Sequence, residues 1–158
     1  MNAEAKPLVG LRLILVEEND LIRRTVAMTA AEFLGIRIAQ AESVSEVPHL
    51  LRQQVFDGLV LSIPCSQELN KLKNLHFLKL IRRGEVGCKT DLPIIALVGD
   101  CTESCLESIK EAGIIQAIVK PFKTRALLKS LMEVFAIETL ADQQIRPEEQ
   151  ANYSLSGS

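Results

Sequence analysis

The chain has 158 residues and a formal net charge of −2, with 47% hydrophobic and 24% charged residues. This length fits one domain with a tail, and the apolar content is sufficient for a sizeable core. The near-neutral charge predicts no nucleic-acid or anionic-membrane partner, and the basic pairs Arg23–Arg24 and Arg82–Arg83 are interpreted as solvated helix faces. No apolar run reaches the roughly 18 residues of a membrane span, and residues 8–16 do not resemble a signal peptide. We therefore expect a cytoplasmic protein.

In the first third of the chain, short apolar runs alternate with helical patterns. Residues 13–16 are aliphatic and bounded by charges, which predicts a buried strand. Asp20 is a plausible N-cap for a helix that Gly35 ends. A strand at 36–41 and a helix opened by Ser43 or Ser45 should follow. The inward faces of these two helices are expected to comprise Ile22, Val26, Ala30, Phe33, Val47, Leu50, Leu51 and Val55.

The rest of the chain repeats the alternation. The expected elements are a strand at 58–63, a helix at about 72–83, a strand at 93–98, a helix from Thr102 or Glu103 to 112, a strand at 117–119 and a helix at 123–135. Five strands alternating with helices indicate an α/β fold with a parallel sheet covered on both faces. The flavodoxin-like, doubly wound order 2-1-3-4-5 is a common solution, with sites at the carboxyl ends of strands. We expect a lead-in at 1–10, a domain at 11–136 and a flexible C-terminal tail at 137–158.

Four motifs occur in order along this pattern. They are Ile14-Leu15-Val16-Glu17-Glu18-Asn19-Asp20, the strand from Phe56-Asp57 to Ser62, Asp91-Leu92-Pro93-Ile94-Ile95-Ala96-Leu97, and Gly113 followed by Ile118-Val119-Lys120-Pro121-Phe122. Together they resemble the receiver (CheY-like, response regulatory) domain of two-component systems, over roughly residues 11–135. The Lys-Pro motif is the most specific of the four.

The resemblance assigns an expected role to six positions. In receiver domains an acidic pair and an acceptor aspartate hold Mg²⁺, a lysine pairs with the phosphoryl group, a hydroxyl on strand four binds it, and an aromatic on strand five reports it. The corresponding residues here are Glu17 and Glu18 for the acidic pair, Lys120 for the lysine, Ser62 for the acceptor, Val98 for the hydroxyl and Ala117 for the aromatic. The acceptor, the hydroxyl and the aromatic are thus all replaced, which indicates a degenerate, pseudo-receiver form.

This pattern predicts a protein that does not use phosphoryl transfer. A serine hydroxyl cannot form the acyl phosphate that a carboxylate forms, and loss of one carboxylate weakens an octahedral Mg²⁺ site. Glu17, Glu18 and Lys120 are then interpreted as mutually neutralising structural residues, with residual Mg²⁺ binding as the weaker reading and no cofactor expected. The Lys-Pro pair can persist because a cis bond shapes the turn.

The predicted function is a non-enzymatic protein–protein interaction module in bacterial two-component-type phosphorelay signalling. Its partner would be a histidine kinase, a regulator or a second copy of the chain, bound through the fourth helix, fifth strand and fifth helix. One alternative is a switch operated by a small ligand or a divalent cation at the carboxyl edge of the sheet. A Ser62–Lys120 hydrolase is disfavoured, because the strand end lacks a nucleophile elbow and an oxyanion hole.

A second alternative is a thiol-based sensor. Cys65, Cys101 and Cys105 are expected at the same edge of the sheet, where a redox pair or soft-metal site is conceivable. Without a CxxC motif, the preferred interpretation is that these thiols are incidental and reduced. The segment 63–74 is interpreted as a lengthened loop that could contact a partner or could simply be tolerated.

Overall fold

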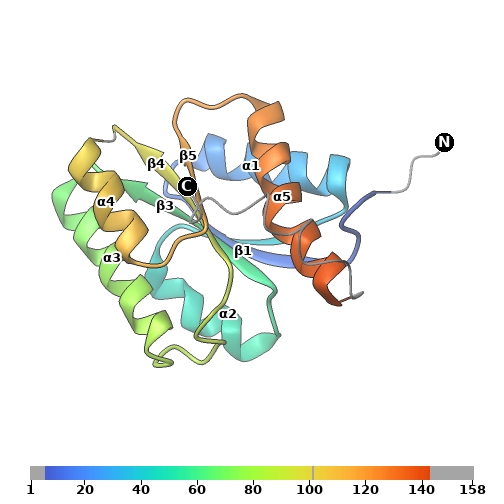
Figure 1. Cartoon of the computed structure of the whole chain (residues 1–158), viewed down its shortest axis with the longest axis horizontal. Coiled ribbons are helices and arrows are strands. Elements are labelled where there is room, and N and C mark those ends of the chain that lie inside the picture. The colour runs from blue at the N-terminus through green and yellow to red at the C-terminus, as the bar shows by residue number, and fades with distance from the viewer. Residues whose placement is uncertain (1–5, 101, 143–158) are drawn as a thin grey trace.

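The computed structural model describes residues 6–100 and 102–142, and the side chains as far as residue 136. A five-stranded parallel sheet in the order β2-β1-β3-β4-β5 lies between two layers of helices (Figure 1). The elements in chain order are β1 (Arg12–Val16), α1 (Asp20–Leu34), β2 (Arg37–Ala41), a 3₁₀ turn (Val44–Glu46), α2 (Val47–Gln53), β3 (Gly58–Pro64), α3 (Glu68–Arg82), β4 (Ile94–Gly99), α4 (Glu103–Glu111), β5 (Gln116–Val119) and α5 (Thr124–Asp142). The expected fold class and strand order are confirmed.

The two faces of the sheet carry separate hydrophobic clusters. One cluster joins alternate sheet residues to α1 and α5, and includes Val26, Leu131 and Phe135. The other joins the remaining sheet residues to α2, α3 and α4, and includes Leu78 and Ile109. Side chains alternate between the faces of a strand, so a central strand covered by helices on both faces must be apolar throughout.

Local signals explain where several elements begin and end. Asn19, rather than the expected Asp20, caps α1, because its side chain accepts a hydrogen bond from the Ile22 amide. Gly35 ends the helix with a φ of 77°, as predicted. At the start of β3, a Cβ on Gly58 would lie 2.3 Å from the Phe135 ring, so only glycine lets α5 approach here.

Helix boundaries differ from those expected in two places. α3 begins at Glu68, so most of the segment interpreted as a lengthened loop is helix. Its first turns carry Leu69 and Leu72 at the same spacing as the later apolar residues, but both of these leucines are exposed. α5 continues to Asp142, past the domain boundary expected at residue 136. Of the tail expected at 137–158, residues 143–158 lie outside the described residues, as do residues 1–5 of the expected lead-in.

Some inward-facing residues were wrongly expected. Phe33 and Val55 are 56% and 81% exposed, whereas Leu34 is buried in place of Phe33. Leu34 is one position further round α1, and α2 ends at Gln53 before Val55 is reached. Within the described residues, no helix is long and apolar enough to cross a membrane.

Two arginines interpreted as solvated are structural. Arg23 is 7% exposed and donates to the Glu17 carbonyl and the Gln40 amide oxygen, while Arg24 is exposed. Arg82 donates to the carbonyls of Thr90, Leu92 and Gly113, and so joins the end of α3 to the segments before β4 and after α4. The expectation of a solvated arginine is therefore wrong for one arginine of each pair, because burial depends on which side of the helix meets the sheet.

Candidate functional site

The expected pocket residues gather at the carboxyl edge of the sheet. Lys120, directly after β5, places its Nζ 2.6 Å from Glu17 Oε1 and donates to Ser62 Oγ at 3.3 Å. Glu17 follows β1 and is 1% exposed, and Ser62 in β3 is 3% exposed. Three segments far apart in sequence therefore converge on one ammonium group, as expected of parallel strand ends.

Backbone contacts hold these side chains in place. The Glu17 and Lys120 amides donate to the carbonyls of Ala41 and Val98, which continues the strand pairing to the pocket. Glu17 Oε2 accepts the Asn19 amide at 2.9 Å. Both carboxylate oxygens of Glu17 thus have partners, as a buried charge requires.

Beside this ion pair lies a small cavity of about 90 Å³. Glu17, Ser62, Glu18 and Glu42 contribute to its lining, together with Lys73. Glu18 is exposed and lacks the fixed geometry of Glu17. The pocket therefore has one carboxylate held by an ammonium group and others that lie toward solvent.

The donor set does not fit Mg²⁺. A magnesium ion requires several oxygen ligands in near-octahedral geometry, but Glu17 is committed to Lys120 and to the Asn19 amide. Within residues 6–100 and 102–142, no three His, Cys, Asp or Glu side chains lie together as a metal site would require.

Two further positions singled out by the resemblance lie near the pocket. Val98 is fully buried in β4 and supplies its carbonyl to the Lys120 amide. Ala117 in β5 is partly buried and packs against the cluster that contains α4. Val119, two residues further along β5, is 50% exposed. The edge between β5 and α4 thus presents small apolar side chains to solvent.

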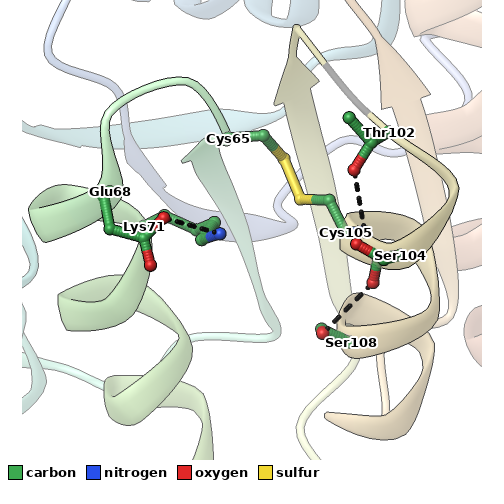
Figure 2. Close-up of a disulfide and its surroundings, with 7 residues drawn as sticks. All are labelled: Cys65, Glu68, Lys71, Thr102, Ser104, Cys105 and Ser108. Carbon is green, nitrogen blue, oxygen red and sulfur yellow. Dashed lines mark hydrogen bonds and ion pairs between the residues drawn. A yellow bond between two sulfur atoms is a disulfide. The ribbon is translucent and has the colours of Figure 1, made fainter.

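A disulfide joins Cys65 to Cys105, so the interpretation of these two thiols as incidental is wrong (Figure 2). Cys65 directly follows β3, and Cys105 lies in the first turn of α4, 40 residues later. The Cα atoms are 6.6 Å apart. Cys101 lies outside the described residues, and Cys88 is a free thiol. The sequence placed Cys65 and Cys105 at the same edge of the sheet, but no local pattern indicated that these two cysteines would pair.

Cys88 lies beside Arg82 at the opposite edge of the sheet. Burial raises the pKa of the Cys88 thiol, and the nearby Arg82 charge opposes this rise. Burial also lowers the pKa of Arg82, partly offset by Asp91 and Cys88. Cys88 is thus a protonated thiol in a structural cluster, unlike the bonded pair.

Sequence reasoning missed a groove of about 510 Å³ between α1 and the start of α5. Its apolar lining includes Leu21, Ile22 and Phe122, and Lys120 lines its inner end. Leu21 is 75% exposed, and Met28 on the same helix is 69% exposed. The sequence did contain a signal for this groove: Leu21 and Met28 are apolar residues on the outward face of the otherwise amphipathic helix α1.

Comparison with known proteins places this geometry in context. No family model matches the chain. It is 30% identical over 120 residues to the CAI-1 autoinducer sensor kinase/phosphatase CqsS of Vibrio cholerae, covering 76% of this chain and 17% of that protein. It is 26% identical over 140 residues to the peroxide stress-activated histidine kinase mak3 of Schizosaccharomyces pombe, covering 79% of this chain and 5% of that protein. The chain thus spans only a small part of these relatives.

Solved structures give the same fold over most of the chain. Chemotaxis response regulator CheY4 of Vibrio cholerae has a TM-score of 0.65 at 22% identity, covering 78% of this chain and 98% of that one. The receiver domain of a sensor histidine kinase from Pseudomonas aeruginosa, which holds magnesium in its active-site cleft, has a TM-score of 0.60 at 23% identity, covering 81% and 99%. The chain therefore has the CheY-like fold of two-component receiver domains.

Proposed function

We propose that this domain is a pseudo-receiver: a protein-interaction module of two-component signalling that works in the cytoplasm without accepting a phosphoryl group. The receiver fold and the sensor-kinase relatives support the pathway. One observation carries the rest of the proposal. The Lys120 ammonium is paired with Glu17 at 2.6 Å and meets a hydroxyl, not a carboxylate, at Ser62.

The chemistry of this arrangement disfavours phosphorylation. An acceptor carboxylate forms a mixed anhydride with phosphate, whereas the Ser62 hydroxyl would need a base to become a nucleophile. The charged group that contacts it is the Lys120 ammonium, a donor that supplies no base. Glu17 already balances that ammonium without any phosphate. We propose no enzymatic activity.

For the partner surface, we propose α4, β5 and α5. Ala117 and the half-exposed Val119 would form an apolar centre, and the exposed Lys110, Lys123 and Arg125 would form a basic rim. Apolar centres with charged rims are typical of protein interfaces. The partner would be a histidine kinase or a regulator of the same pathway, with self-association as the other outcome.

The first experiment tests phosphorylation directly. Acetyl phosphate or beryllofluoride with Mg²⁺ should leave the amide NMR spectrum of the protein unchanged. The Ser62→Asp variant serves as the matched comparison, because it adds the missing carboxylate while Val98 and Ala117 remain. We expect this variant to gain cation binding but no broad phosphate-driven change. An acid-labile acyl phosphate on the wild-type chain would overturn the proposal.

A second experiment tests the surface. Ala117→Arg would place a charge at the centre of the patch and should weaken partner or self-association by about 2 kcal/mol or more. Ala31→Arg makes the same change at an exposed position of α1 and should leave association unchanged. Circular dichroism would establish that both variants fold. Loss of binding in Ala31→Arg alone would move the contact to α1.

A further inference from the structure

The disulfide lies at a weakly attached corner of the fold. α4 has nine residues, all described, and buries two of them, Cys105 and Ile109. At the far end of α4, Arg82 donates to the Gly113 carbonyl at 2.7 Å and provides a separate anchor. Cys105 therefore supplies one of the two buried contacts of the helix and the covalent link at its amino end.

The other partner of the bond is firmly placed. The Cys65 amide donates to the Gly99 carbonyl at 3.2 Å, and the neighbouring Pro64 is in register with Gly99. Cys65 is thus fixed to the ends of two central strands. As Figure 2 shows, the disulfide runs from this strand end to the first turn of α4. The bond therefore ties a short helix that buries only two of its residues to the central sheet.

The two sulfurs differ in exposure and electrostatics. Cys65 is partly exposed, whereas Cys105 is 5% exposed. The Cys105 amide donates to the N-cap side chain of Thr102 at 3.2 Å, which places Cys105 in the first turn. The positive end of a helix dipole stabilises a thiolate there. Cys65 is thus the more exposed residue of the pair, and Cys105 is the better leaving group.

We propose that Cys65 and Cys105 form a reversible redox modification site, oxidised by hydrogen peroxide and reduced by dithiols, that controls the attachment of the amino end of α4. In a cytoplasmic setting, disulfides are usually transient and redox-sensing, so the bond would mark an oxidised state. The site does not depend on the interaction surface proposed above. An oxidation signal would thus reach a fold in which Lys120 is paired with Glu17.

Oxidation is balanced with peroxide as the only oxidant. The Cys65 thiolate attacks a peroxide oxygen, the O–O bond breaks, and a sulfenic acid forms as hydroxide leaves and takes a proton. The Cys105 thiolate then attacks the Cys65 sulfur, the S–O bond breaks, and a second hydroxide leaves as water. Two thiols and one peroxide thus give one disulfide and two waters.

Reduction reverses the bond at the exposed sulfur. A dithiol thiolate attacks Cys65 Sγ, and Cys105 leaves as a thiolate stabilised at the helix amino end. The second thiol of the reductant then attacks the mixed disulfide and releases Cys65, while the reductant is oxidised to its own disulfide. Cys105 is now free of the sheet, and α4 is held by Ile109 and by the Arg82 contact at its far end.

The test uses the full chain in both redox states. The protein is reduced with dithiothreitol, freed of reductant and treated with hydrogen peroxide, and the thiols are counted by alkylation and mass spectrometry. Hydrogen exchange is followed in parallel. Reduction should speed exchange in the first turns of α4 by about tenfold or more, leave the central strands β1, β3 and β4 protected, and be reversed by peroxide.

Two variants that lack the bond and two controls make the result decisive. Cys65→Ser and Cys105→Ala should each show fast α4 exchange that peroxide does not slow. Cys88→Ser is the matched control and should respond like wild type, as should Cys101→Ser. Continued protection of the central strands establishes that each variant is folded. The proposal is overturned if peroxide fails to restore the bond, if α4 exchange is the same in both states, or if Cys101→Ser abolishes the bridge.

Discussion

Two cross-links close the carboxyl edge of the sheet, and they differ in kind. The Glu17–Lys120 ion pair joins the end of β1 to the end of β5 in a site where the carboxylate is 1% exposed. The Cys65–Cys105 disulfide joins the end of β3 to α4 at a partly exposed corner. The ion pair is intact whenever both groups are charged, whereas the disulfide depends on the redox state around it.

The difference follows from what surrounds each link. Glu17 has a partner for each carboxylate oxygen and lies against the central strands, so neither solvent nor cation competes for it. α4 lies at the periphery, where it buries only Cys105 and Ile109 of its nine described residues. The Glu17–Lys120 region can thus stay the same while the attachment of α4 changes. The following predictions test this contrast, in order of expected effect.

Loss of the disulfide should have the largest effect on stability. A bond that closes a loop of 40 residues is worth up to about 4 kcal/mol in the chain-entropy model. Urea unfolding of the oxidised and reduced protein should differ by an amount approaching this value. Cys88→Ser should show the same difference, and equal midpoints in the two redox states would show that the bond adds no stability.

Removal of the lysine should have the next largest effect. Lys120→Met would leave the Glu17 carboxylate buried with only the Asn19 amide as a donor. We expect a loss of about 2–3 kcal/mol, since a buried charge without its partner is costly and Lys120 is partly solvated. Lys123→Met removes an exposed lysine nearby and should change the unfolding free energy little. Equal stability of the two variants would contradict the role given to Lys120.

Arg82 of α3, which contacts the segment after α4, tests whether α4 depends on both the disulfide and this contact. Arg82→Met would remove donors to the carbonyls of Thr90, Leu92 and Gly113. We expect a loss of about 1–2 kcal/mol, because these carbonyls are partly solvated and water replaces some of the bonds. The loss should be greater in the reduced protein, where α4 has no covalent tie. Additive effects would mean that the two ends of α4 are independent.

Cys88 should give the smallest effect and serves as the reference thiol. Burial raises its pKa, so in the folded state the protonated thiol persists to higher pH than in the unfolded chain. Its contribution to stability is complete below the unfolded-state pKa of roughly 8.5 and is lost as pH rises through the folded value. Alkylation of Cys88 should therefore be slow at neutral pH and faster in urea. Alkylation at neutral pH as fast in the native as in the unfolded protein would contradict this.

Much of the architecture is determined by the sequence itself. The aliphatic runs at 13–16, 58–63 and 93–98 each become a central strand, because a strand covered on both faces must be apolar throughout. Gly35 ends α1 because a positive φ favours glycine. The convergence of Glu17, Ser62 and Lys120 also followed from the sequence, since parallel strands bring their carboxyl ends to one edge.

Other features were decided only by the tertiary structure. The first turns of α3 carry Leu69 and Leu72 at helical spacing but leave both exposed, so burial against the sheet does not mark where this helix begins. The roles of Arg23 and Arg82 depend on carbonyls supplied by distant segments. The pairing of Cys65 with Cys105 spans 40 residues and depends on where α4 docks. Periodicity reports the local burial of a segment, but a contact between distant residues depends on how separate elements pack, which no local pattern contains.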